Sequence, residues 1–142
     1  MEAISSPKRQ QLGALLDRQS QESVMQQIPQ FAEARIHNLV PAPEGTTGSL
    51  GALVFNMERG VHLEELGDFL LSCPDVRPYD VILANELDDG CVRSGGRDTA
   101  RELAERLGMN YVYALEFIEL VNQDDPKGYH GNAVFSRWPI RR

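Results

Sequence analysis

Short apolar segments alternate with amphipathic ones between residues 50 and 136, and this alternation constrains the fold more than any other feature. Residues 63–72 and 98–107 carry apolar side chains at the spacing of one helix face. Strand-length apolar runs surround these helices, at 50–57, 79–83, 111–118 and 131–136. The order β-α-β-α-β-loop-β predicts an α/β or α+β fold with a mixed sheet. We expect the first two strands to be neighbouring central strands, with both helices on one face.

The N-terminal segment has helical periodicity, so we expect a helical extension ahead of the sheet. Its second helix is predicted over 23–36, and Pro29 is expected to kink or split it. Residues 41–49 are rich in Pro, Gly, Thr and Ser and mark a domain boundary. We therefore divide the chain into a helical extension with its linker, 1–44, and a main domain, 45–142. The extension either packs on the main domain or binds a partner.

Composition narrows the class of protein. No apolar run approaches the roughly 20 residues that a membrane span needs, and the N-terminus has no apolar signal segment. The two cysteines form no metal or disulfide pattern, which fits a reducing cytosol, so we expect a cytoplasmic protein. The net charge of −7 leaves no basic surface for non-specific nucleic-acid binding. Acidity does not exclude phosphate chemistry, because bound divalent cations invert the local charge.

Polar side chains follow the first two predicted strands. Asn56 and Glu58 follow the first, and Asn85 and Glu86 follow the second. Ligands of open α/β sheets gather at the carboxyl ends of strands, and a carboxylate there suits a hard cation such as Mg²⁺. Spacing alone leaves open that these acids are helix caps or solvated turns.

Five sequence runs carry a stronger signal when they are taken in order: FNMERG, YDVILANELD, RDTARELAERLGMNY, LEFIEL and HGNAVFSRWPI. Together they resemble the opening motifs of the endonuclease/exonuclease/phosphatase (DNase I-like) superfamily, over residues 50–142. The resemblance implies the N-terminal half of a two-sheet α/β sandwich. It also implies a hydrolase that cleaves a phosphodiester or phosphomonoester with Mg²⁺ or Mn²⁺. The substrate class stays open among nucleic acids, inositol phosphates and phospholipid head groups.

The resemblance further implies roles for single residues. Glu86 matches the metal-ligating glutamate, and Asn56 matches the asparagine that holds the metal and the scissile phosphate. We therefore expect these two side chains to converge at the same end of the sheet. Glu58 matches a position that reaches the metal through water, and Arg137 matches an arginine that faces phosphate. Asn85 stands where the family usually has Gln, which puts its orienting role in doubt.

Four other residues are candidates for substrate contact or for positioning. By resemblance, Asn132 lines the site, and Glu116 orients a histidine from a later strand. Residues 87–97 are predicted to be a polar, glycine-bearing loop that carries Arg93, and His130 is predicted to lie in a loop just before the fourth strand. Either side chain can meet an anionic substrate. The alternative for each is a solvated loop residue, because the loop around Arg93 lacks the Lys-Ser/Thr pair of a phosphate-binding loop.

Motifs that the family takes from its later strands do not occur in this sequence: the catalytic histidine, Asp-x-Asn and the final Asp-His pair. We therefore expect a half-domain with an uncovered apolar face, which associates with its absent half or with a second copy. We expect no catalysis by the chain alone. The alternative is a non-catalytic binding or regulatory module that uses the half-site and the N-terminal helices.

Overall fold

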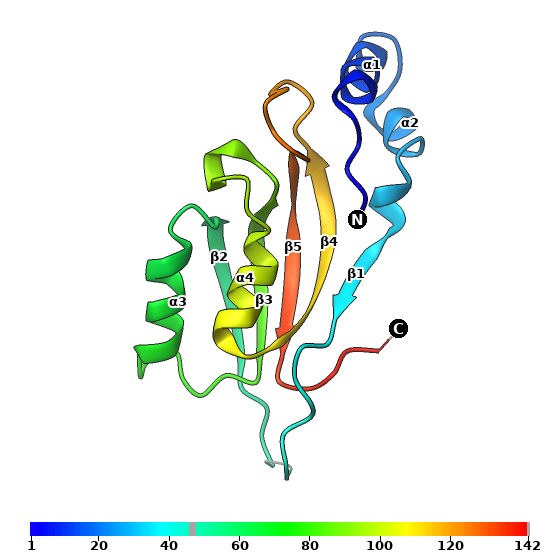
Figure 1. Ribbon diagram of the computed structural model, residues 1–142. Coiled ribbons are helices and arrows are strands. Elements are labelled where there is room, and N and C mark those ends of the chain that lie inside the picture. The colour runs from blue at the N-terminus through cyan, green and yellow to red at the C-terminus, as the bar shows by residue number, and fades with distance from the viewer. Residues whose placement is uncertain (46–47, 142) are drawn as a thin grey trace.

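The computed structural model describes residues 1–45 and 48–141, and it has an α+β fold with a five-stranded mixed sheet (Figure 1). β2 and β3 are parallel, and the other neighbouring pairs are antiparallel. The predicted mixed sheet with flanking helices is confirmed. The strands lie in the order β1-β4-β5-β3-β2, and their bounds are Ala34–His37 (β1), Ala52–Arg59 (β2), Val81–Asp89 (β3), Asn110–Ile118 (β4) and Tyr129–Ser136 (β5).

The first two predicted strands are neighbours, as expected, but the prediction that both are central was wrong. β3 lies inside the sheet, whereas β2 forms one of its edges. The β2–β3 register is regular from Ala52–Val81 to Asn56–Asn85. The place of a strand in a sheet depends on long-range pairing, which the local apolar pattern does not encode.

β3 and β5 extend beyond their apolar runs. The segment from residue 87 was predicted to be a loop, yet Leu87, Asp88 and Asp89 continue β3 and are almost fully buried. His130 was also placed in a loop, whereas it lies in β5 and pairs with Asp88 in the ladder. Buried charges can continue a strand where hydrogen-bonded partners compensate them, and this compensation is invisible in a hydropathy pattern.

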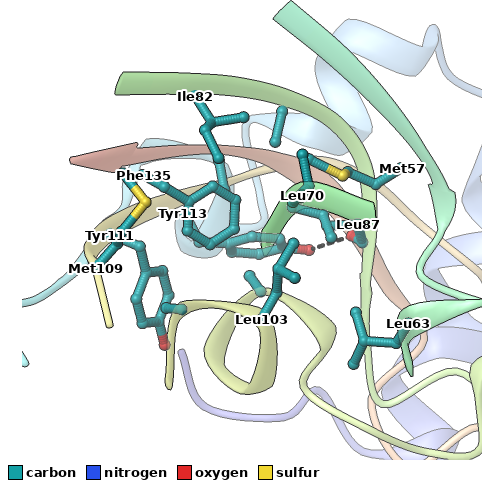
Figure 2. Close-up of a cluster of buried hydrophobic side chains, with 14 residues drawn as sticks. Met57, Leu63, Leu70, Ile82, Leu87, Leu103, Met109, Tyr111, Tyr113 and Phe135 are labelled. Carbon is teal, nitrogen blue, oxygen red and sulfur yellow. Dashed lines mark hydrogen bonds between the residues drawn. The ribbon is translucent and has the colours of Figure 1, made fainter. Parts of the chain in front are cut away.

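Two helices, α3 (Leu63–Ser72) and α4 (Thr99–Leu107), cover one face of the sheet, as predicted (Figure 1). Leu70 and Leu103 are fully buried against sheet residues in the main core (Figure 2). The buried hydroxyl of Tyr113 donates a hydrogen bond to the Leu87 carbonyl oxygen at 3.2 Å. This bond satisfies a polar group that would otherwise be costly inside the core.

Local sequence sets the ends of α4. The Asp98 side chain accepts a hydrogen bond from the Arg101 N–H, which caps one of the unpaired donors of the first turn. Gly108 follows with φ of 63°, in the left-handed region that favours glycine, and ends the helix. The predicted bounds of this helix are therefore confirmed.

The predicted split of the second helix at Pro29 is confirmed, but the prediction that the segment stays helical to residue 36 was wrong. The N-terminal segment instead forms α1 (Ser6–Leu16), α2 (Gln21–Met25), the 3₁₀ turn η1 (Pro29–Ala32) and then β1. Proline lacks an N–H and restricts the residue before it to extended geometry, so Ile28 is extended and the helix cannot continue. The chain that follows pairs with β4 from Ala34–Ala114 to His37–Tyr111.

The N-terminal helices pack on the end of β4 through a second, smaller core. Leu12, Val24 and Ile28 are buried there, and Ile118 and Leu120 pack against them. A buried arginine fastens the same region. Arg9 Nη2 donates to the Asp125 carbonyl oxygen at 2.6 Å. The extension therefore packs on the sheet, in addition to contributing β1 to it.

The face of the sheet opposite α3 and α4 is bare in its middle among the described residues. Val54 and Leu83 are 68% and 43% exposed on it. We call this side the open face. A shallow hollow of about 230 Å³ marks it, and its lining includes Leu83, Asn85, Val112, Ala114, Asn132 and Val134.

Within residues 1–45 and 48–141, no helix is long and apolar enough to cross a bilayer. Cys73 and Cys91 are both free thiols. Burial raises the pKa of Cys91 to about 12, so this thiol stays protonated at neutral pH and is a poor nucleophile.

Candidate functional site

Three strands of the sheet are irregular at one level, and each irregularity carries a glutamate. In β3, Asn85 and Glu86 together oppose the single Asn132 of β5. In β4, Glu116 is an extra residue between two regular pairs with β5. In β2, Glu58 lies in the register shift against β3. Bulges of this kind re-aim side chains and are common beside active sites.

The backbone at this level is strained. Glu86 and Glu58 have φ of 57° and 47°, in the left-handed region that costs about 1–2 kcal/mol for a residue with a Cβ. In β3 the left-handed residue brings the Glu86 side chain to the open face, while Leu87 returns to the core. The sheet holds Glu86 in this conformation through the regular pairs on either side of it.

Asn56 and Glu86 converge, which confirms the expected geometry. Asn56 Nδ2 donates to Glu86 Oε1 at 2.9 Å, across the parallel β2–β3 pair. Asn56 Oδ1 accepts from the Glu58 N–H at 2.8 Å. The Asn56 amide is therefore held at both ends, and its hydrogen bond fixes the direction of the Glu86 carboxylate.

Asn132 supports the site from β5. Its Oδ1 atom accepts from the Glu86 N–H at 3.3 Å and from Asn85 Nδ2 at 3.4 Å. The structure thus brings together four sequence-predicted site residues on the open face: Asn56, Asn85, Glu86 and Asn132.

The donor set at this site fits a hard cation. The second carboxylate oxygen of Glu86 has no protein partner in the described part of the chain, and the oxygen of Asn56 keeps a second lone pair. Mg²⁺ and Mn²⁺ take such oxygens, and Mg²⁺ usually keeps several waters beside one or two carboxylates. Among residues 1–45 and 48–141, no three His, Cys, Asp or Glu side chains cluster closely enough to hold a metal. Water and substrate would therefore have to complete the shell.

A charged cluster lies next to this site on β3 and β5. Asp88 accepts two hydrogen bonds from Arg93, both at 2.8 Å, and pairs with His130 Nδ1 at 2.8 Å. The Asp88 and His130 side chains are 0% and 4% exposed. The expectation of a solvated loop histidine was therefore wrong, because Asp88 and the ring of Phe117, stacked at 4.3 Å, enclose His130.

The Asp88 carboxyl group is stabilised in its ionised form by its hydrogen-bond partners. Burial acts to raise the pKa of Asp88, but the hydrogen bonds from Arg93 and His130 outweigh it and lower the pKa to about 2. The hydrogen bonding between Arg93 and Asp88 also raises the pKa of Arg93. Asp88 is thus already the partner of Arg93. Arg93 could contact an anionic substrate only by sharing this carboxylate or by leaving it.

His130 retains one ring nitrogen for chemistry. In the described part of the chain, Nε2 has no hydrogen-bond partner and is not one of the fully buried unpaired atoms, so solvent reaches it. A carboxylate on Nδ1 orients the ring, as in catalytic histidine pairs.

Other candidates lie elsewhere. Arg137 is bound to Asp80 at 2.8 Å, beside the first residue of β3, and the structure does not bring it to Glu86. Glu116 is exposed at the β4 bulge, close to Phe117. A large hollow of about 850 Å³ lies over α2 and η1, and none of the predicted site residues lines it.

Sequence reasoning missed Asp88. The segment after Glu86 was taken as a polar loop, so its acids were given no partner. A signal existed: Asp88 lies two residues after Glu86 and one after an apolar Leu87, a pattern that can continue a strand.

The fold and the site together define an α+β protein with an acid–amide site at the bulged level of its sheet. The chain matches no protein-family model, no curated protein and no solved structure.

Proposed function

We propose that this chain carries part of the active site of a divalent-metal-dependent phosphoesterase, a hydrolase that uses Mg²⁺ or Mn²⁺. The supporting observation is the Asn56–Glu86 contact of 2.9 Å at aligned bulges on an open sheet face. A carboxylate held by an amide, with no cationic side chain bound to it among residues 1–45 and 48–141, is an arrangement that suits a hard cation. The resemblance over residues 50–142 supports the same chemistry.

Each residue has a defined task in this proposal. Glu86 holds the cation, which when bound polarises a phosphate oxygen. Asn56 fixes the Glu86 carboxylate, and Asn132 holds the Glu86 backbone from the other side. His130, oriented by Asp88, is placed to exchange a proton with solvent or a phosphate oxygen at Nε2.

Turnover requires more than these residues. The cation site has one or two protein oxygens, and the contacts that stabilise the transition state are too few. We therefore propose that another protein surface, such as a second copy of the chain, covers the open face before hydrolysis occurs. The two free thiols and the lack of a spanning helix in the described residues are compatible with a cytoplasmic protein.

Manganese binding tests the proposal without relying on turnover. Mn²⁺ titration followed by electron paramagnetic resonance should give weak binding, with a Kd of about 10⁻⁴–10⁻³ M. Glu86→Gln keeps the acceptor for Asn56 Nδ2 but removes the charge, so it should abolish binding. Glu65→Gln, on the exposed side of α3, is the matched control and should bind like the wild type. Equal binding in the Glu86→Gln variant and the wild type, or none in the wild type, would refute the cation site.

A second candidate function is a non-catalytic binding or regulatory module. The exposure of Val54 and Leu83 on the open face favours it, because monomeric proteins seldom leave such a face bare. The manganese titration distinguishes the two candidates. A phosphoesterase site should bind Mn²⁺ at Glu86, whereas a purely binding module needs no cation there.

A further inference from the structure

A cavity of about 160 Å³ lies between the N-terminal helices and the end of β4. We call it the α2–β4 pocket. Val24, Met25 and Ile28 form the wall on the side of the N-terminal segment, and Phe117 and Leu120 form the wall on the side of the sheet. The small second core supports both walls, since Val24 and Ile28 are almost fully buried in it.

Phe117 joins the pocket to the candidate site. Its ring lines the pocket and also stacks on His130, with 4.3 Å between the ring centroids. His130 pairs with Asp88, and Asn132, two residues further along β5, accepts from the Glu86 N–H. Alternate residues of a strand share one face. A strip of side chains on this side of the sheet therefore runs from Glu86 through Asn132 and the enclosed His130 to Phe117 at the pocket.

The strand order sets the length of this strip. Glu86 lies on β3 and Phe117 on β4, with β5 between them. Two strand spacings of about 4.8 Å separate their backbones by about 10 Å. A ligand with its phosphate at Glu86 must cross this distance before it enters the pocket.

The lining of the pocket restricts what can enter. Its side chains are apolar except for Gln21 and Glu116. The Glu116 carboxylate disfavours an anion, and a nucleobase would leave several donors and acceptors unpaired against apolar walls. The volume of about 160 Å³ is close to that of an apolar cavity of about 150 Å³ that holds one benzene molecule. A short stretch of hydrocarbon fits both the chemistry and the volume.

We propose that the α2–β4 pocket binds the end of a linear apolar chain carried by the phosphate ester that the site acts on. The inference rests on the proposed function and adds a substrate class to it: an ester with an apolar chain that extends at least about 10 Å from the phosphorus. One wall comes from α2 and η1, outside the segment that resembles the phosphoesterase family. The N-terminal extension therefore selects the substrate.

A series of n-alkyl phosphates tests the inference by calorimetry on the Mn²⁺-loaded protein, below micelle-forming concentrations. An extended chain advances about 1.3 Å per carbon, from C–C bonds of roughly 1.5 Å, so about eight carbons cross the strip. The affinity should stay nearly level from ethyl to hexyl phosphate. From octyl to dodecyl phosphate it should rise by up to about fourfold per methylene.

The position of the bound alkyl chain is read from the NMR signals of the methionine methyl groups. Met25 lines the pocket, whereas Met57 and Met109 are buried in the main core and serve as internal controls. Decyl phosphate should shift the Met25 signal and leave the other two in place. Leu16→Trp narrows the pocket and should abolish the chain-length dependence. Leu71→Trp, at a leucine of similar exposure near the end of α3, should not.

The outcomes separate the pocket from the proposed function. If ethyl phosphate binds with Mn²⁺ but longer chains bind no better, the pocket inference is overturned and the function stands. A chain-length dependence that persists unchanged in Glu86→Gln without Mn²⁺ also overturns the inference, because the pocket would then be independent of the phosphate site. If neither Mn²⁺ nor ethyl phosphate binds, both are overturned. A rise in affinity with chain length that is lost in Leu16→Trp and kept in Leu71→Trp supports both the pocket inference and the proposed function.

Discussion

Replacing Asp88 by Asn should destabilise the protein at neutral pH by an amount that follows from its pKa. The pKa of Asp88 is lowered to about 2 from an ordinary value of 3.8. At about 1.36 kcal/mol per pH unit, this gap corresponds to roughly 2–3 kcal/mol of unfolding free energy. Asn has the same shape but no charge, so it loses this stabilisation and leaves His130, 4% exposed, without its carboxylate.

The pH dependence distinguishes this electrostatic loss from a packing defect. Because the folded pKa of Asp88 is below the unfolded value, its contribution is fully present above about pH 4. It is lost as the pH falls through about 2, where the wild-type carboxylate becomes neutral like Asn. The stabilities of wild type and Asp88→Asn should therefore converge between these values.

Urea unfolding followed by circular dichroism, repeated from neutral pH down to about pH 3, measures the difference. Asp75→Asn is the control, since Asp75 is exposed in the turn after α3. A difference near zero at neutral pH would show that Arg93 and His130 are satisfied without the charge. A difference that stays constant down to pH 3 would show that the loss comes from packing, and either result refutes the reasoning.

Three further predictions follow from the fold and the open face. Gly131→Ala should lower the free energy of unfolding, measured with urea, by about 3 kcal/mol or more, because a Cβ there would overlap the Ala114 carbonyl oxygen and lie 2.8 Å from Tyr113 Cζ. The control Gly48→Ala, with open space around the new Cβ, should leave it unchanged. The chain should associate with rising concentration in light scattering, and the double change Val54→Ser with Leu83→Ser should reduce this association. Unchanged association in the double variant would show that the open face does not drive it. Residues 1–142 alone should release no p-nitrophenol from bis-p-nitrophenyl phosphate with Mg²⁺ or Mn²⁺. Turnover that Glu86→Gln abolishes would contradict this and make His130 the base.

The Asn56–Glu86 contact could be predicted from the sequence because it depends on short-range information. Each residue follows an apolar run, and two parallel strands joined by one helix bring their carboxyl ends together. The same rule predicted both helices on one face. It could not place β2 at the edge, because the strands that complete the sheet are paired by contacts far apart in sequence.

The Asp88–His130 pair could not be predicted in this way. The two residues are 42 positions apart, and their register depends on the bulge at Glu86, which no apolar pattern encodes. β1 escaped prediction for a related reason. Four residues are too few to show a period, and Ala34–His37 becomes a strand only because β4 offers an edge to pair with.

Because Glu86 is an extra residue in the β3 bulge, the site can change without any change in the sheet that carries it. On β3, Ala84 and Leu87 are in the core, Asn85 and Asp88 are on the open face, and Glu86 is interpolated between them. Deleting Glu86 would leave each of the other four on the face it now occupies. The glutamate is therefore a supernumerary residue that a single codon insertion could add and a deletion could remove without inverting the strand. A lineage could acquire or discard the proposed site while the hydrophobic core stays the same.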